Sequence, residues 1–567
     1  MAHAWEKSYP AGVNWNLDLP PLDLVSFFNE TTAKFTSRPC FDFMDKLVTY
    51  GEFRQMVDRA AKGFQKLGVG PGVHVGLFLP NTPHYPIAFF GILKAGGVVV
   101  NYSPLDAERE LKFKIEDSQT DIIVTLGLNA LYPKMAGFLG STRLKKIVVG
   151  GVEDFLPFPK NLLFPLARRK DISAIPADDR HIRFKALLDN DGSFKPVPVT
   201  DPGETLAALQ YTGGTTGTPK GAMLTHQNFT ATLRLYGHWS DSDGSLKQGE
   251  ERVLAVLPLF HIYGLSALML RALHVGSLMV LHPRFELEAV VRDLVKKRIT
   301  VFAGVPTMYT GIANHPRIAE MNLSGLKQCA CGGAPLPLEV QEKFEQLTGI
   351  KVSEGWGMTE TAPAGAATPL VGLRKKGSCG LPLPRIEISV VDVDDPDKVL
   401  PLGQRGEICI KGPNVMKGYW NKPAETAEAF RGGHFHTGDI GYLDEDGFMF
   451  LVDRKKDMIL SGGFNVYPRN IEEAIYEYPA VEEVTVIGIP DAYRGQAAKA
   501  FVKLRAGAKP FTIEELNAFL KDKLGKHELP AAVDFRAELP KTPVGKLSKK
   551  ELYEEEQAKR DAGARAA

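Results

Sequence analysis

Short apolar runs alternate with helical patterns through most of the chain, and this alternation limits the fold more than any other feature. Val73–Pro80 and Asp121–Leu126 have the length and the β-branched content of buried strands, whereas His84–Gly96 between them has helical spacing. Strands that alternate with helices are typical of α/β layers built on largely parallel sheets. The alternation continues to Gly357, so the sequence predicts an α/β fold with room for two such sheets.

The pattern changes after Val390, where turns and hairpins replace the alternation. A charged run, Asp453–Asp457, then precedes a compact order of helix, strand, strand, helix and strand that ends near Arg536. A chain of 567 residues is too long for a single core. We therefore predict a large N-terminal domain (residues 1–452) of layered α/β subdomains plus a small β-rich part, and a small α+β C-terminal domain (residues 453–567).

Composition excludes several classes of protein. A net charge of +1 gives no reason to expect a nucleic-acid partner, and five cysteines do not make a disulfide framework. The first twenty residues lack the apolar core of a secretory signal, and no apolar run reaches the ~20 residues that a membrane span needs. We expect a cytoplasmic protein.

The segment Tyr211–Gly221, YTGGTTGTPKG, is the strongest candidate for a ligand-binding loop. Glycines let backbone N–H groups converge on an anion, threonine hydroxyls donate further hydrogen bonds, and Lys220 adds a positive charge. The spacing differs from that of a P-loop NTPase, because Pro219 precedes the lysine and Gly221 follows it. The pattern predicts a phosphate-binding loop of another kind; the alternative is a flexible surface loop.

A second segment, Phe155–Ser173, differs from its surroundings. Apolar residues crowd it, prolines interrupt it, and Arg168, Arg169 and Lys170 follow its apolar part. One interpretation is a patch that rests peripherally on a membrane surface, in a bacterium the inner membrane. The other is an ordinary surface excursion folded back onto the body. The sequence leaves both open.

Several further motifs follow in a fixed order along the chain. They are GGAPL (Gly332–Leu336), EGWGMTE (Glu354–Glu360), HTGD (His436–Asp439), DRKKD (Asp453–Asp457), SGGFNVYP (Ser461–Pro468) and LPKTPVGKLSKKEL (Leu539–Leu552). With the Tyr211–Gly221 loop, this set resembles the acyl-adenylate-forming enzymes. Within that family the chain is most similar to bacterial long-chain fatty-acid–CoA ligases, and the resemblance covers almost the whole chain.

The resemblance implies a site for ATP and AMP. The residues that would contact the nucleotide are Thr212, Gly213, Gly214, Thr215, Thr216, Gly217, Lys220, Gly332, Gly333, Ala334, Trp356, Gly357, Met358, Asp439 and Arg454. Trp356 stands where the family usually has tyrosine and would stack on adenine. Asp439 would accept both ribose hydroxyls, since an ionised carboxylate can accept from two donors.

The resemblance also implies a catalytic set of Lys546, Thr359, Glu360 and His261, and Mg²⁺ held by Thr215 and Glu360. Mg²⁺ prefers carboxylate and phosphate oxygens. Lys546 would reach from the small domain to the acid and the α-phosphate. The alternatives are a solvated basic tail for Lys546, a helix-terminal carboxylate for Glu360 and a satisfied buried histidine for His261.

In the family, a mobile small domain serves two half-reactions. It would rotate about Asp453 and Lys456, replace Lys546 by the CoA-binding segment Ser461, Gly462, Gly463 and Phe464, and so pass from acyl-AMP formation to thioester formation. ATP, a fatty acid and CoA would be the substrates, and the protein would be a homodimer. A ligase for medium-chain or aryl acids, an enzyme that loads a carrier protein and a non-catalytic binding homologue stay as alternatives.

Overall fold

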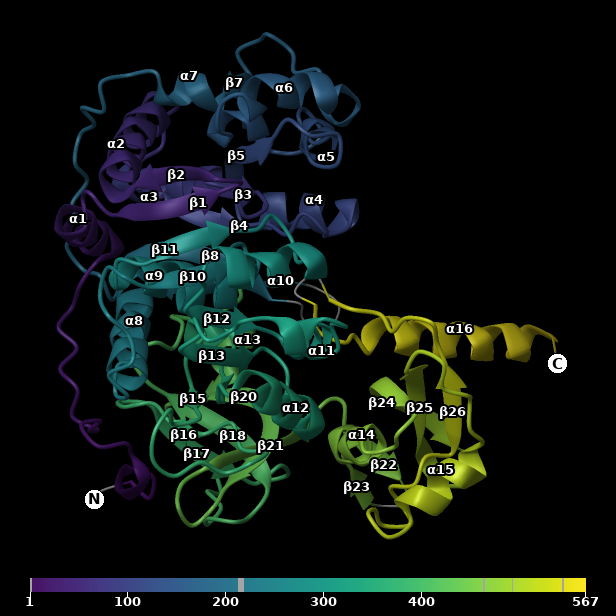
Figure 1. Cartoon of the computed structure of the whole chain (residues 1–567). Coiled ribbons are helices and arrows are strands. Elements are labelled where there is room, and N and C mark those ends of the chain that lie inside the picture. Colours follow the sequence, from purple (N-terminus) through teal and green to yellow (C-terminus); the bar gives the residue numbers. More distant parts are fainter. Residues whose placement is uncertain (1–2, 213–218, 462–463, 492, 543–544, 567) are drawn as a thin grey trace.

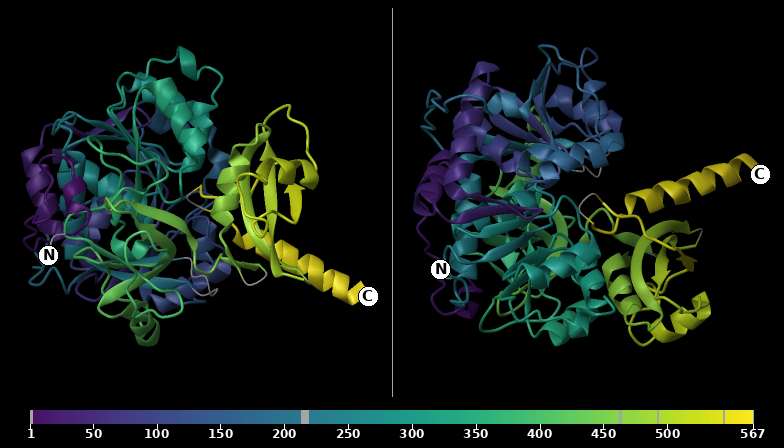
Figure 2. Two further views of the ribbon diagram at one scale, coloured as in Figure 1. Left: turned by 90° about the horizontal axis from the view of Figure 1, so that it is seen from below. Right: turned by 45° about the horizontal axis from the view of Figure 1, so that its top comes forward.

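A large and a small body lie next to each other in the computed structural model of the chain (Figures 1 and 2). The structure describes residues 3–212, 219–461, 464–491, 493–542 and 545–566. The large body has a continuous apolar core that runs through all of its sheets, and the small body has a separate core that includes Ile471, Val486 and Leu516. Two independent cores agree with a two-domain chain; the boundary at residue 453 and the mobility of the small domain stay predictions.

The first sheet of the large domain has seven strands in the order β7-β6-β5-β3-β4-β8-β9. Its neighbours pair in parallel except β8 and β9, which form an antiparallel hairpin. The strands are β3 (His74–Phe78), β4 (Val98–Asn101), β5 (Thr120–Leu126), β6 (Lys146–Gly150), β7 (His181–Arg183), β8 (Leu206–Thr212) and β9 (Lys220–Thr225).

The second sheet has nine strands in the order β16-β15-β14-β13-β12-β10-β11-β1-β2. Its centre is parallel, and antiparallel strands close both edges. The strands are β1 (Pro39–Phe43), β2 (Lys46–Thr49), β10 (Arg252–Ala255), β11 (Leu278–Leu281), β12 (Val301–Gly304), β13 (Gln328–Gly332), β14 (Val352–Trp356), β15 (Ala366–Ala367) and β16 (Leu381–Pro382).

Helices cover and separate these sheets. Every residue of α3 (His84–Lys94) is buried, as expected of a helix packed on more than one side. The others are α1 (Leu24–Lys34), α2 (Tyr50–Lys66), α4 (Glu108–Asp117), α5 (Tyr132–Ala136), α6 (Lys160–Ala167), α7 (Phe184–Leu188), α8 (His226–Ser240), α9 (Arg271–His274), α10 (Leu287–Lys296), α11 (Pro306–Ala313), α12 (Leu338–Thr348) and α13 (Pro423–Ala429). Capping boxes at Thr49 and Thr225 fix the starts of α2 and α8.

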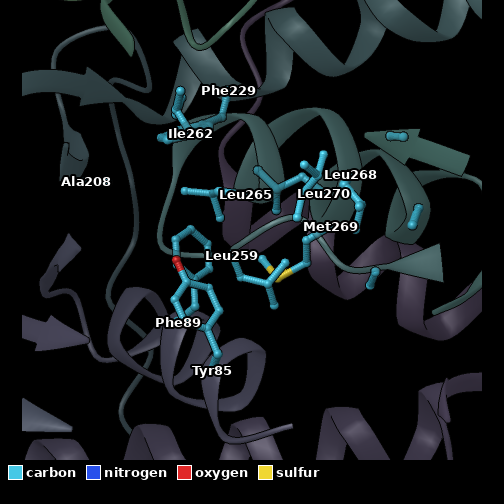
Figure 3. Close-up of a cluster of buried hydrophobic side chains, with 14 of the residues drawn as sticks. Tyr85, Phe89, Ala208, Phe229, Leu259, Ile262, Leu265, Leu268, Met269 and Leu270 are labelled. Carbon is cyan, nitrogen blue, oxygen red and sulfur yellow. The ribbon is translucent and has the colours of Figure 1, made fainter. Parts of the chain in front are cut away.

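The segment before α9 is a π-helix, Tyr263–Leu270. Its apolar side chains meet those of α3 and α8 in a buried cluster that includes Phe89, Phe229, Leu265 and Met269 (Figure 3). π-Helical turns are uncommon and often lie at functional sites. Here the turn follows directly after His261 and Ile262.

The β-rich part of the large domain is an antiparallel sheet in the order β17-β18-β20-β19, with β21 on β20. Its strands are β17 (Glu387–Val391), β18 (Gly406–Lys411), β19 (Phe430–Arg431), β20 (His434–Leu443) and β21 (Met449–Arg454). The turn between β20 and β21 contains Gly447 with φ +81°, the conformation that the hairpin prediction required.

The small domain packs helices around a sheet in the order β23-β22-β25-β24, with β26 on β25. Its elements are β22 (Ile459–Ser461), β23 (Phe464–Val466), α14 (Pro468–Tyr476), β24 (Val481–Asp491), β25 (Gly495–Leu504), α15 (Ile513–Leu520), β26 (Ala532–Phe535) and α16 (Lys550–Ala566). The sequence predicted its elements from α14 to β26 in this order, and they are confirmed.

The α/β class and the division into layered sheets, a β-rich part and an α+β unit are also confirmed. One prediction needs correction. The Tyr211–Gly221 segment is not a loop throughout, because Tyr211 and Thr212 end β8 while Lys220 and Gly221 begin β9, pairing with them in register. The Phe155–Ser173 segment packs on the body at its start, where Phe155 and Leu156 are buried, and both interpretations of the rest of it stay open.

Candidate active site

The predicted site residues lie where strand ends of the two sheets and the β-rich part face one another. β13 and β14 are neighbouring parallel strands that end at Gly332 and Trp356, and Gly332 is in register with Gly355. The carboxyl ends of parallel strands are the usual place for ligand sites in α/β sheets. Gly357 tolerates no side chain, because a Cβ there would lie 1.4 Å from the carbonyl oxygen of Pro363.

Trp356, Asp439 and Arg454 form one hydrogen-bonded group. The indole Nε1 of Trp356 donates to Asp439 Oδ2 over 2.7 Å, and Arg454 Nε lies 2.6 Å from Asp439 Oδ1. Asp439 and Arg454 are in register on β20 and β21. The Trp356 ring lies against the backbone of Gly365, where a Cβ would come within 2.4 Å of it. The indole is therefore fixed in orientation by a carboxylate on one side and a glycine backbone on the other.

Glu360 is buried beside Tyr419, whose hydroxyl donates to Glu360 Oε1 over 2.9 Å. Burial raises the pKa of Glu360 above its ordinary value. Lys220 Nζ lies 5.1 Å from the centre of the Tyr419 ring. The cation at the end of the predicted phosphate-binding loop therefore lies near Tyr419 and Glu360. Thr359 precedes Glu360 in a 3₁₀ turn that Thr361 closes by accepting from the Met358 N–H.

Lys546 enters this site from the small domain. Its Cε would lie 2.7 Å from a Cβ placed on Gly333, so the side chain occupies the space that a residue other than glycine would fill. A tight turn presents it: the Thr542 N–H donates to the Lys546 carbonyl, and the Lys546 N–H donates to Thr542 Oγ1. Thr307 Oγ1 of α11 holds the turn by donating to the Gly545 carbonyl over 2.7 Å.

The environment of Lys546 favours its neutral form more than water does. Burial, followed by the positive charge of Arg454, lowers the pKa of Lys546 to about 8, although Asp439 opposes the change. Burial and then the charge of Lys546 lower the pKa of His261 to about 3. The Nδ1 atom of His261 accepts from the Tyr263 N–H over 3.3 Å, so neutral His261 carries its proton on Nε2.

The predicted CoA segment lies elsewhere. The β22–β23 hairpin is at the far end of the small domain from the start of α16, near which Lys546 lies (Figure 1). Ser461 is buried, whereas Phe464 is 58% exposed and stacks on His527 at 4.7 Å between ring centres. Lys546 therefore lies beside the residues predicted to bind the nucleotide, whereas Ser461 and Phe464 of the predicted CoA segment do not.

The predicted hinge lies between the two bodies. Asp453 accepts from the N–H groups of Arg454 and Arg469, which attaches the end of β21 to the start of α14. Lys455 is held by the large domain, 3.3 Å from Glu407 Oε2. Lys456 forms no ion pair or hydrogen bond with another described residue, and burial lowers its pKa. A hinge at Lys456 stays a prediction.

Some predicted residues lie outside those that the structure describes. These are Gly213, Gly214, Thr215, Thr216, Gly217, Gly462 and Gly463. Conversely, sequence reasoning missed three residues that contact the site: Tyr419, Tyr263 and Thr307. Tyr263 packs near Gly332, where a Cβ would lie 3.2 Å from its Cζ. No local pattern marks these three, because each acts through a contact with a distant part of the chain.

Comparison with known proteins agrees with the geometry. Residues 28–420 match the family AMP-binding enzyme, and residues 470–546 match AMP-binding enzyme C-terminal domain. The chain is 41% identical to a long-chain-fatty-acid–CoA ligase of Bacillus subtilis (strain 168) over 97% of this chain and 98% of that protein. It is 37% identical to the enzyme of the same name from Escherichia coli O6:H1, over 99% of this chain and all of the relative.

Similarity also extends to a relative named for another acid and to solved structures. A feruloyl-CoA synthase of Amycolatopsis sp is 34% identical over 89% of this chain and 93% of its own length. Among solved structures, ATP-bound MatB from Rhodopseudomonas palustris superimposes with a TM-score of 0.81 at 28% identity and covers 94% of this chain and 99% of its own. Because the family match spans most of both domains, the chain belongs to the AMP-binding enzymes.

Proposed function

We propose that the chain activates a long-chain fatty acid with ATP to acyl-AMP and then transfers the acyl group to CoA, releasing AMP and pyrophosphate. The observation that supports this proposal most is the position of the Lys546 side chain against Gly333, beside the Trp356–Asp439–Arg454 group. Full-length similarity to ligases named for long-chain fatty acids supports the class of acid.

In the first step the fatty carboxylate attacks the α-phosphorus of ATP. An acyl–oxygen–phosphorus linkage forms, and the bond to pyrophosphate breaks. Both partners are anions, so the site must align them and neutralise charge. Lys546 supplies a positive charge from the side of Gly333, the Thr359 hydroxyl would donate to the α-phosphate, and neutral His261 would present its Nε2–H to the acid.

The nucleotide would lie between β14 and β20. Trp356 would stack on adenine, with Gly332, Gly333, Ala334, Gly357 and Met358 lining the same space. Asp439 already accepts one bond on each oxygen, but each oxygen of an ionised carboxylate has a second lone pair. It can therefore also accept from two ribose hydroxyls.

Mg²⁺ would be held by Glu360 with Thr215, and chiefly by the phosphates of ATP. Glu360 fits this role because Tyr419 contacts only its Oε1 among the hydrogen bonds of the described chain, and because a buried carboxylate is stabilised by a cation. No cluster of three acidic, histidine or cysteine residues suited to a metal occurs in the described ranges. Mg²⁺ commonly binds through one or two carboxylates and substrate phosphates, where it offsets their charge.

The second step requires another arrangement. Rotation at Lys456 would withdraw Lys546 and bring Ser461, Gly462, Gly463 and Phe464 to the acyl-AMP. The CoA sulfur would then attack the acyl carbonyl, and AMP would leave. Closing each state against water matters, because an acyl phosphate anhydride hydrolyses readily.

We further propose a cytoplasmic enzyme that contacts a membrane peripherally and forms a homodimer. None of the helices in the described ranges is long and apolar enough to cross a bilayer. The dimer rests on the family resemblance alone, and size-exclusion chromatography with light scattering would test it.

A panel of acids tests the function. Pyrophosphate release and acyl-CoA formation would be measured with palmitate, octanoate and ferulate, each with and without CoA. We expect acyl-CoA to form fastest from palmitate and to require CoA. A preference for ferulate or octanoate would contradict the proposed long-chain substrate and support a ligase for aryl or medium-chain acids. Transfer to an acyl carrier protein instead of CoA would contradict the proposed second step.

A further inference from the structure

Helix α6 exposes an apolar surface that the catalytic site does not use. Leu162, Leu163 and Leu166 on the helix and Phe158 just before it are 55% to 79% exposed, whereas Phe164 turns inward and packs against the core. The helix therefore lies along the body with one face attached and one free. Exposed apolar side chains that gather on one short helix are typical of an interaction surface.

A segment distant in sequence extends this surface. Lys160, the first residue of α6, lies 3.1 Å from Asp45 Oδ2 in the turn between β1 and β2. Two more exposed apolar side chains lie here, Met44 in that turn and Leu47 in β2. Lys297 secures it by binding Asp42 and Asp45, at 2.7 and 2.6 Å. The α6 surface, as we call it, thus comprises Met44 to Leu47 and Phe158 to Lys170.

The charges on the α6 surface are mostly positive. The five cations Lys46, Lys160, Arg168, Arg169 and Lys170 outnumber the carboxylates, which are Asp45 within the surface and Asp171 directly after it. Asp45 is already paired with Lys160 and Lys297, and Asp171 lies 3.4 Å from Arg168. Lys46, Arg169 and Lys170 form no ion pair within the described part of the chain, so this surface has unpaired positive charge.

We propose that the α6 surface binds the face of an anionic lipid bilayer, with its leucines at the boundary between headgroups and acyl chains. The proposal rests on the proposed function, whose membrane contact it makes specific. A bilayer is favoured over a protein partner because exposed leucines near the unpaired cations Arg169 and Lys170 match an apolar layer beneath anionic headgroups. A surface-bound enzyme would also meet its apolar substrate where that substrate dissolves.

Vesicle flotation tests the proposal with the full-length protein. We expect the unmodified chain to float with phosphatidylglycerol vesicles at low salt and much less with phosphatidylcholine vesicles. Arg169→Gln with Lys170→Gln should weaken partitioning by about 5-fold per charge removed, and the difference should fade at high salt. Leu162→Ser with Leu166→Ser should weaken it by at least about 10-fold, with little dependence on salt.

The matched control is Val399→Ser with Leu402→Ser. These are also exposed apolar residues, but they precede β18, at the opposite end of the large domain from α6 (Figure 1). This variant should float normally. Equal flotation of the α6 variants and the unmodified chain, or no flotation of the unmodified chain, would overturn the proposal. So would a change of oligomeric state in the leucine variant, because the α6 surface would then join copies of the chain.

Activity on octanoate without vesicles separates this proposal from the proposed function. The α6 variants should form octanoyl-CoA at the unmodified rate, since none of their residues lies in the catalytic site. Normal activity with lost flotation supports the membrane surface. An unmodified chain that floats but activates no acid would refute the proposed function while leaving the surface intact.

Discussion

Two segments of the small domain are predicted to take part in catalysis, and they lie in different surroundings. The turn with Lys546 is packed into the large domain, held by Thr307 and seated on Gly333. Strands β22 and β23, which carry Ser461 and Phe464 of the predicted CoA segment, lie at the other end of the same domain, with Phe464 exposed. A rigid small domain cannot present both to one site. The contrast indicates an arrangement for acyl-AMP formation and implies a second one for thioester formation.

The largest expected effect tests whether Lys546 serves one half-reaction. Lys546→Ala should slow acyl-AMP formation by about 10²- to 10³-fold, because it removes a charge aimed at the transition state. With preformed acyl-AMP and CoA, the same variant should form acyl-CoA at nearly the unmodified rate. Rapid-quench assays of each half-reaction make the measurement. An equal loss of rate in both half-reactions would show that Lys546 does not serve acyl-AMP formation alone.

Trp356, which would stack on adenine, should contribute to ATP binding. Base–aromatic stacking is worth ~1–3 kcal/mol, so Trp356→Ala should raise the KM for ATP by roughly 5- to 150-fold. Trp356→Tyr should have little effect on it, since the ring stays. Trp356→Phe serves as the control for the bond to Asp439, because it keeps a ring but loses the Nε1 donor. An unchanged KM in the alanine variant would place adenine elsewhere.

Stiffening the hinge should produce the reverse of the Lys546 phenotype. Proline fixes φ, and the Lys456 N–H makes no hydrogen bond to another described residue, so Lys456→Pro removes no such donor from the fold. Acyl-AMP should still form, while thioester formation falls by at least roughly 10-fold. Thermal unfolding must first show that the small domain is intact. A folded variant that keeps both half-reactions would rule out rotation at this residue.

The smallest expected effect is the pH dependence of acyl-AMP formation. The pKa of Lys546 is lowered to about 8, so the lysine is charged below pH 8 and becomes neutral above it. The kcat/KM of acyl-AMP formation, which reports the free enzyme, should therefore fall by up to about tenfold per pH unit above 8. Lys546→Arg should shift that fall to higher pH, because arginine stays charged. A profile that is flat to pH 10 in the unmodified enzyme would contradict this assignment.

Sequence patterns predicted the strands well because β-branched runs and flanking glycines are local signals. They did not predict the bond from Trp356 to Asp439 or that from Tyr419 to Glu360, which join residues 83 and 59 positions apart. The family resemblance named Lys546 and Gly333 separately, but their contact depends on how two domains dock. Tyr419 had no signal at all, since a single tyrosine at an isolated β-bridge resembles any other tyrosine in the sequence.

The register of Asp439 with Arg454 has a consequence for the fate of the intermediate. Arg454 is the last residue of β21 and belongs to the nucleotide group, while Lys456, only two residues later, is where free movement would begin. If both predictions hold, the part that binds AMP and the part that moves are adjacent but distinct. An enzyme with this division can exchange one catalytic segment for another without loosening its grip on acyl-AMP. Labelled acyl-AMP made in the first step should then reach CoA without mixing with acyl-AMP added to the solution.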